Sequence, residues 1–160
     1  MTPSGAAASA AAICLAAAAL EGVCAGRGVR RRLEALRQPA HSPPFAGWVV
    51  IGIAYYAISF AVLFRLLRLE PSTLRAAAFA AAIALLLGNA FWSYAFFRRG
   101  SLAAGVAVLT GYTLLAVVLE GLLLRLDTPA AGVFLVYVLY LVYAVWWLRS
   151  LRRLNAAPRV

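Results

Sequence analysis

One amide and two aromatic side chains recur at helical spacing near the middle of the chain. Asn89, Trp92 and Phe96 stand at positions i, i+3 and i+7, which lie on one face of a helix. The segment around them is apolar, and an unsatisfied amide in hydrocarbon is costly, so Asn89 must face other helices. There it either hydrogen-bonds to a neighbouring helix or contacts a ligand. An amide beside aromatic rings suits a flat, mostly apolar ligand, whereas an ordinary bundle core is the alternative.

Aromatic residues also mark the last apolar segment of the chain. Tyr137, Tyr140 and Tyr143 recur every three residues, which keeps them near one helical face. This face is either a cavity wall or a plain packing surface. Trp146 and Trp147 stand just before Arg149, and this pattern predicts an anchor at the membrane–water interface.

Three ionisable residues have two interpretations each. Glu21 and Glu120 lie inside apolar segments, where ionisable groups are functional candidates by default. Their opposite depths disfavour a shared acid pair or metal site, and each could instead reach lipid headgroups or a nearby arginine. His41 is either solvated in a loop or an axial ligand to a tetrapyrrole metal. The sequence contains no HExxH, paired CxxC or phosphate-binding glycine loop, so we expect no hydrolytic or nucleotide chemistry, and we predict that the protein is not an enzyme.

The elements that position these residues are membrane-spanning helices. Of the 160 residues, 65% are hydrophobic and 12% are charged, with a mean hydropathy of +0.89. Soluble domains have about 25% charged residues, so this composition excludes a water-soluble globule and a disordered chain. A span needs about 20 apolar residues. The sequence predicts an all-α integral membrane domain that contains five transmembrane helices, at residues 5–25, 45–64, 76–97, 102–124 and 130–148.

The basic residues indicate an orientation in the membrane. The net charge is +10, and every basic residue is an arginine. One side of the predicted bundle carries the larger group, and the other side carries only Arg65, Arg68, Arg75 and Arg125. The positive-inside rule then predicts a cytoplasmic C-terminus and an external N-terminus, in a bacterial inner membrane. Nucleic acid is not an expected partner, because the arginines alternate with apolar segments. The larger group is Arg27, Arg30, Arg31, Arg32, Arg37, Arg98, Arg99, Arg149, Arg152, Arg153 and Arg159.

Three motifs resemble those of a known family. The segment from Leu36 to Pro44 is similar to L-x-K-P-x-x-x-P-P, with Gln38 in place of the lysine. Span three ends in N-x-x-W-[SP]-x-x-F-F, from Asn89 to Phe97. In span five Tyr137, Tyr140, Tyr143 and Ala144 resemble a third motif, followed by Asn155. These segments resemble the translocator protein / tryptophan-rich sensory protein (TspO/MBR) family over nearly the whole chain.

The resemblance implies a function in ligand binding. Members bind tetrapyrroles, such as protoporphyrin or haem, or sterol-like lipids within the bundle, with a sensory, transport or regulatory output. No cofactor is required; bound porphyrin, haem or lipid would be the ligand. Membrane lipid is a partner, and homodimers are common in the family, often through the third helix. The resemblance implies ligand contacts at Asn89, Trp92, Phe96, Tyr56, Tyr140, Tyr143, Ala144, Pro43 and Pro44.

The chain also departs from the family pattern. Gly52 and Tyr140 occupy positions where the family has tryptophans. Some members are implicated in porphyrin degradation through cavity tryptophans, so we expect no such turnover here. The same losses favour an alternative function, in which the protein is an accessory subunit of a larger membrane complex and any bound pigment or lipid is structural.

Overall fold

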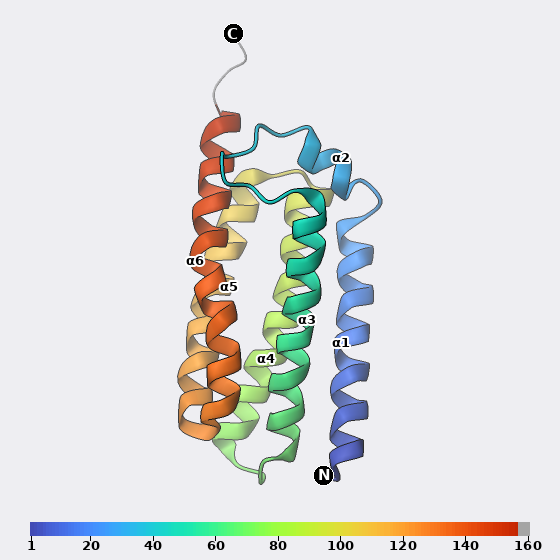
Figure 1. Ribbon diagram of the computed structural model, residues 1–160, viewed down its shortest axis with the longest axis vertical. Helices are drawn as coiled ribbons and strands as arrows, with labels where there is room; N and C mark the ends of the chain where they lie inside the picture. The colour runs from blue at the N-terminus through green and yellow to red at the C-terminus, as the bar shows by residue number, and fades with distance from the viewer. Residues whose placement is uncertain (157–160) are drawn as a thin grey trace.

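The computed structural model describes residues 1–156, and these residues form helices and no strands. The all-α prediction is therefore confirmed for the described chain, whereas Arg159 lies outside it. Five helices are long and apolar enough to cross a membrane (Figure 1). They are α1 (Pro3–Ala25), α3 (Phe45–Arg68), α4 (Thr73–Ser93) with its continuation η1 (Tyr94–Arg98), α5 (Leu102–Leu126) and α6 (Thr128–Ala156).

Polar side chains set where the helices begin. The side chains of Thr2, Ser72 and Ser101 accept hydrogen bonds from backbone N–H groups in the first turns of α1, α4 and α5. This is the usual N-cap arrangement, and it satisfies donors that have no partner within the helix. Pro44 precedes α3 with an extended backbone. Gly26 follows α1 with a φ of 73°, a conformation that favours glycine.

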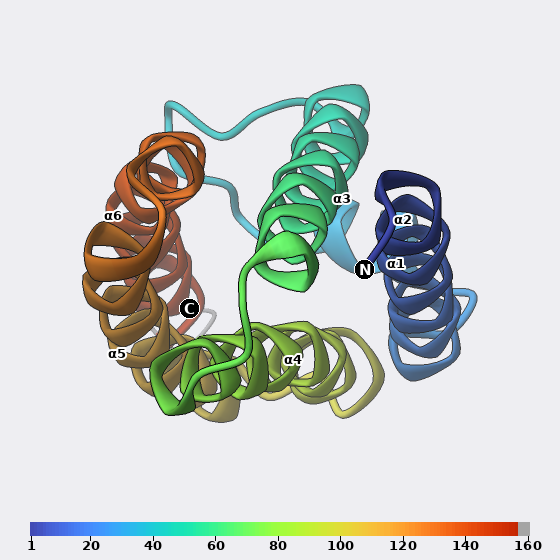
Figure 2. The ribbon, with the colours of Figure 1, turned by 90° about the horizontal axis from the view of Figure 1, so that it is seen from below.

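The five long helices form a closed ring (Figure 2). α1 packs between α3 and α4, α5 packs between α4 and α6, and α3 and α6 complete the circle. The alanine-rich α1 buries Ala6, Ala10, Cys14 and Ala17, which recur on one face. Small residues of this kind let helix backbones approach closely in lipid.

Two helices differ from the spans that the sequence predicts: α6 is longer, and α2 was not predicted. α6 continues to Ala156, although the span was expected to end near residue 148, because Leu148 and Leu151 stay buried while neighbouring arginines are exposed. The loop between α1 and α3 contains a short helix, α2 (Val29–Glu34), of which only Leu33 is buried. Six residues are too few to show a recognisable helical period in the sequence.

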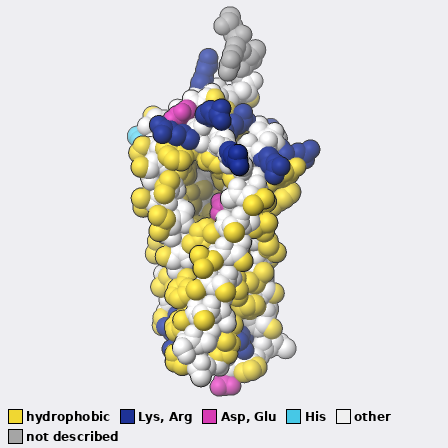
Figure 3. All heavy atoms as spheres, turned by 90° about the vertical axis from the view of Figure 1, so that its right-hand side faces the viewer, with side chains coloured by type: hydrophobic (Ala, Val, Ile, Leu, Met, Phe, Trp, Pro, Cys, Tyr) yellow, Lys and Arg dark blue, Asp and Glu magenta, His cyan; other side chains and the backbone are white. Residues whose placement is uncertain are grey.

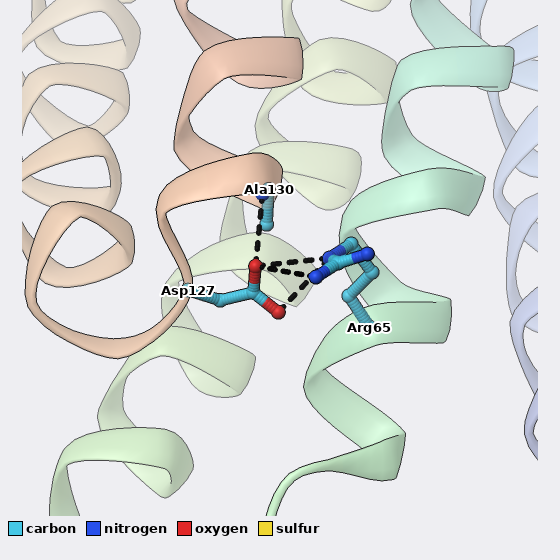
Figure 4. Close-up of polar contacts among 3 residues, drawn as sticks. All are labelled: Arg65, Asp127 and Ala130. Atoms are coloured by element: carbon cyan, nitrogen blue, oxygen red, sulfur yellow. Dashed lines mark hydrogen bonds and ion pairs between the residues drawn. The ribbon is translucent and has the colours of Figure 1, made fainter.

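Arginines collect at both ends of the bundle and leave an apolar band between them (Figure 3). We call the end that carries α2 and the end of α6 the arginine-rich end (Figure 1), and the end with the α3–α4 and α5–α6 turns the opposite end. At the opposite end Arg65 donates to both carboxylate oxygens of Asp127 at 2.9 Å (Figure 4). Asp127 Oδ1 also accepts from the backbone N–H of Ala130 at 3.1 Å, so one carboxylate joins α3 to the start of α6.

Candidate functional site: an aromatic pocket

A pocket with a volume of about 260 Å³ lies inside the ring at the arginine-rich end, beneath α2. All five long helices and α2 contribute to its walls. The residues used in the argument below are Glu21 from α1, Leu33 from α2, Trp48, Gly52 and Tyr55 from α3, Asn89 and Trp92 from α4, Phe97 from η1, Tyr112 from α5, and Tyr137, Tyr140, Ala144 and Trp147 from α6.

The α3 wall combines two large rings with a gap. Trp48, Gly52 and Tyr55 stand at i, i+4 and i+7, so they share one face. A Cβ built at Gly52 would meet no heavy atom within 4 Å. The position that holds a tryptophan in the family pattern is therefore open space in this chain.

A π-helical turn changes which aromatic residue faces the pocket from α4. In η1 the backbone N–H of Arg99 donates to the carbonyl oxygen of Tyr94 at 2.9 Å, a five-residue step that inserts one extra residue into the turn. Asn89, Trp92 and Phe97 therefore line the pocket. Phe96 is fully buried behind them and stacks on Trp92, with ring centroids 5.1 Å apart and planes 7° apart.

The residues of α6 that line the pocket recur with the 3.6-residue period of an α-helix, and not at every third residue. Tyr137, Tyr140, Ala144 and Trp147 line the pocket. Each three-residue step turns about 60° backward around the helix, so Tyr143 leaves the face that Tyr137 occupies. The Tyr143 hydroxyl instead donates to the carbonyl oxygen of His41 at 2.8 Å.

Two polar atoms in the lining have no hydrogen-bond partner. They are the indole N–H of Trp92 and the hydroxyl of Tyr55, both buried. Deeper in the bundle the hydroxyls of Tyr112 and Tyr137 bond to each other at 2.6 Å. Because buried donors in folded proteins nearly always have a partner, a small movement of the lining around a ligand could satisfy both groups.

Glu21 projects into the pocket rather than toward headgroups. Its Oε2 accepts from the Tyr56 hydroxyl at 2.7 Å, and its Oε1 accepts from the Ser93 hydroxyl at 2.9 Å. Tyr56 thus supports the lining without being part of it. Glu120 is buried on α5 outside the pocket, so the two acids form no common site. No group of three His, Cys, Asp or Glu in the described chain is arranged to hold a metal ion.

Hydrogen bonds hold the α2–α3 loop across the end of the pocket. Gln38 Nε2 donates to the carbonyl oxygen of Leu33 at 2.6 Å, and Ser42 Oγ donates to Gln38 Oε1 at 2.8 Å. The indole N–H of Trp147 donates to Ser42 Oγ at 3.0 Å. Asn155 pairs with the backbone of Arg37 through two bonds of 3.1 Å. The loop is thereby attached to both α2 and α6.

The prolines and the histidine of this loop lie away from the pocket lining. Pro43 and Pro44 shape the entry to α3, since a Cβ at Gly47 would come within 2.9 Å of Pro43 Cβ. His41 is exposed, with its ring 6.5 Å from that of Trp146.

The predicted tryptophan anchor is half wrong. Trp146 is 44% exposed, as an interfacial anchor would be, but Trp147 is 2% exposed and lines the pocket. Adjacent residues on a helix point about 100° apart, so the two rings cannot both face lipid.

Sequence reasoning missed several lining residues: Trp48, Tyr55, Tyr112 and Trp147. The i, i+4, i+7 spacing of Trp48, Gly52 and Tyr55 was a usable signal for the α3 wall. Tyr112 gave none, because a single tyrosine in an apolar span has no spacing to interpret.

Comparison with known proteins agrees with this geometry. A search of curated proteins returned no match. The TspO/MBR family matches residues 10–150, which include every long helix in whole or in part. The five-helix ring, the motif residues on α4 and the matched length lead to one conclusion: the chain is an integral membrane protein that belongs to the TspO/MBR family.

Proposed function

We propose that the pocket binds a flat hydrophobic ligand, of the tetrapyrrole or sterol-like class, and that its occupancy gives a sensory or regulatory output. The main support is the pair of buried polar groups without partners, Trp92 Nε1 and Tyr55 Oη, within an aromatic lining. The volume of about 260 Å³ is close to the lower end of ligand pockets, which hold about 300–1,000 Å³. Of the two classes, the narrower sterol-like ring system fits this volume more easily than a tetrapyrrole macrocycle.

Tryptophan fluorescence tests ligand binding, because Trp48, Trp92 and Trp147 line the pocket and Trp146 does not. Protoporphyrin, haem, a carotenoid and a fluorescent sterol would be titrated separately into the purified protein. We expect saturable quenching at micromolar concentration by at least one of them. Trp92→Phe should weaken that binding, because it removes the free indole N–H but keeps a ring. Trp146→Phe is the matched control and should leave the affinity unchanged. Linear quenching by all four ligands would contradict the proposal.

The orientation belongs to the same proposal. With the arginine-rich end in the cytoplasm of a bacterial cell, the pocket would lie in the inner leaflet of the inner membrane. Reporter fusions at the two termini should then report opposite compartments, with the C-terminal one cytoplasmic. Two reporters in one compartment would refute this orientation.

A second candidate function is an accessory subunit of a larger membrane complex. The open space at Gly52 favours it, since the pocket lacks a ring that the family pattern provides. Purification in mild detergent separates the two functions. A stoichiometric larger partner supports the subunit, whereas a monodisperse monomer or homodimer supports the ligand-binding protein.

We further propose that the protein does not degrade porphyrins, because Gly52 and Tyr140 replace the family's cavity tryptophans. Light-dependent loss of bound protoporphyrin above a protein-free control would show the opposite.

A further inference from the structure

The pocket carries one kind of formal charge. Among the described residues that line it, Glu21 is the only carboxylic acid, and none is an arginine, lysine or histidine. The arginines of α2, such as Arg30 and Arg31, are exposed and absent from the lining. Figure 3 shows an acidic side chain inside a hollow on the face that α1 occupies, surrounded by apolar side chains. The interior of the pocket is therefore negative, although the end of the bundle above it is strongly positive.

Hydrogen bonds from two other helices fix the Glu21 side chain. Tyr56 on α3 donates to one carboxylate oxygen at 2.7 Å and Ser93 on α4 donates to the other at 2.9 Å. Each carboxyl oxygen of Glu21 thus has a hydroxyl partner on another helix. A carboxylate can accept about four hydrogen bonds, so these two donors leave acceptor capacity for a ligand.

We infer that Glu21 makes the pocket selective for flat apolar molecules that carry a hydrogen-bond donor, a hydroxyl or a protonated amine, and against those that carry a carboxylate. Of the proposed ligands, this selectivity favours the sterol-like class over protoporphyrin and haem, whose propionate groups are carboxylates. This inference rests on the proposed function, since it specifies the chemistry of the ligand in the same pocket. A donor that reaches Glu21 forms a charge-assisted hydrogen bond, which is stronger than a neutral one. A ligand carboxylate at the same place is repelled by a charge that apolar walls screen poorly.

The free polar groups specify the rest of the ligand. The indole N–H of Trp92 can only donate, so it requires an acceptor on the ligand. An oxygen at one edge and a donor at another would satisfy Trp92 and Glu21 together. A hydroxylated ring system meets both requirements.

The arginine-rich end opposes this selectivity, and the balance can be decided physically. Exposed arginines attract anions, but solvent and salt screen them beyond about 8 Å. Glu21 acts at contact distance in an apolar enclosure, where screening is weak. The arginines should therefore favour anions at the surface, while Glu21 sets the preference inside the pocket.

A matched set of fluorescent probes tests the inference: 1-pyrenemethylamine, 1-pyrenemethanol and 1-pyreneacetic acid. The three share one flat frame and accept energy from tryptophan, so binding to the full-length protein in detergent is measured in the same way for each. We expect the wild-type protein to bind the amine at least about tenfold more tightly than the acid, with the alcohol between them.

Glu21→Gln keeps the size of the side chain and removes its charge. It should reduce the difference between amine and acid to less than about threefold. Glu70→Gln is the matched control, because it makes the same change of net charge at the opposite end, where Glu70 is exposed. It should preserve the wild-type ranking. Thermal unfolding of both variants monitors folding, and Tyr56→Phe provides a second probe, since it removes one of the donors that hold the carboxylate.

The possible results distinguish a pocket that binds no ligand from a pocket in which Glu21 does not set the preference. If no probe gives saturable energy transfer with the wild-type protein, the proposed ligand binding fails and the inference fails with it. If all three bind with equal affinity, or the acid binds best, the pocket stands but the role of Glu21 is refuted. An unchanged ranking in Glu21→Gln refutes that role as well.

Discussion

The two ends of the bundle are built from the same five helices and differ in what they enclose. At the opposite end small and aliphatic residues fill the interior: Val62, Leu66, Ala78, Leu123, Ala130 and Ala131 are at most 2% exposed. At the arginine-rich end seven tyrosines and tryptophans line a pocket of about 260 Å³: Trp48, Tyr55, Trp92, Tyr112, Tyr137, Tyr140 and Trp147. Small residues let backbones approach, whereas large rings keep them apart and leave space between them. Residue size thus helps to fill the interior at the opposite end and to leave a pocket in the interior at the arginine-rich end.

The polar contacts of the two ends differ in the same way. At the opposite end Asp127 is satisfied by Arg65 and by the N-terminus of α6 (Figure 4). At the other end Trp92 Nε1 and Tyr55 Oη stay unpaired. The contrast holds for Asp127 against these two pocket groups only, since Glu120 Oε2, on the last turns of α5 toward the opposite end, is also buried without a partner.

The largest loss of stability should come from removing the carboxylate of Asp127 at the opposite end, which joins α3 to α6. Asp127→Ala removes an ion pair whose acid side chain is 7% exposed, together with the cap of α6. We expect a loss of about 2–3 kcal/mol, toward the low end for a buried pair because Arg65 is 41% exposed. Unfolding in mixed detergent and dodecyl sulfate micelles measures it. Asp127→Asn should cost less, since asparagine still caps the helix; equal losses in both variants would show that the cap contributes nothing.

Enlarging a side chain should affect the two ends in opposite ways. Ala78→Leu adds three carbons where the native side chain is fully buried, and should destabilise the protein by about 1–3 kcal/mol. Gly52→Leu adds volume where a Cβ meets nothing within 4 Å, so it should leave stability nearly unchanged and weaken ligand binding instead. Unfolding and fluorescence titration of both variants give the comparison. A destabilised Gly52→Leu protein that binds ligand normally would contradict it.

A smaller effect is expected where the loop is attached to α6. Trp147→Phe keeps a ring in the pocket and removes the indole N–H that donates to Ser42. The expected cost is about 0.5–1.5 kcal/mol, the usual contribution of one hydrogen bond. Limited proteolysis of residues 36–44 should become faster. Trp146→Phe serves as the control, because no hydrogen bond of that indole is seen, and its cleavage rate should match the wild type.

The smallest effect should come from the exposed pair between Glu34 and Arg30 on α2. Their 2.7 Å contact raises the pKa of the Arg30 guanidinium through the hydrogen bond from Arg30 to Glu34. Solvent screens such pairs, so Glu34→Gln should leave unfolding unchanged within error. A clear loss of stability would mean that α2 supports the fold and not only the cover of the pocket.

Much of this architecture could be predicted from the sequence, because the spans depend on composition over about 20 residues. Asn89 and Trp92 could be placed on one face by spacing alone. The sequence could not show that Phe97, and not Phe96, lines the pocket. That arrangement depends on a π-turn, which no local sequence pattern predicts. Trp147 stands at i+7 from Tyr140 and i+3 from Ala144, so the helical repeat alone places it on the pocket face of α6.

Glu21 illustrates the same limit for the site. The sequence identified an acid in an apolar span, but the donors that hold it come from Tyr56 and Ser93 on other helices. Only the packing of α1 against α3 and α4 determines whether that acid faces headgroups or the pocket.

Hydrogen–deuterium exchange of the full-length protein, with and without the tightest-binding ligand of the fluorescence panel, tests the division between the two ends most directly. The pocket predicts that ligand slows exchange in residues 29–36, 48–55 and 137–147 and leaves residues 62–67 and 119–131 unchanged. Slower exchange confined to the opposite end, or spread evenly over all five helices, would contradict a binding site at the arginine-rich end.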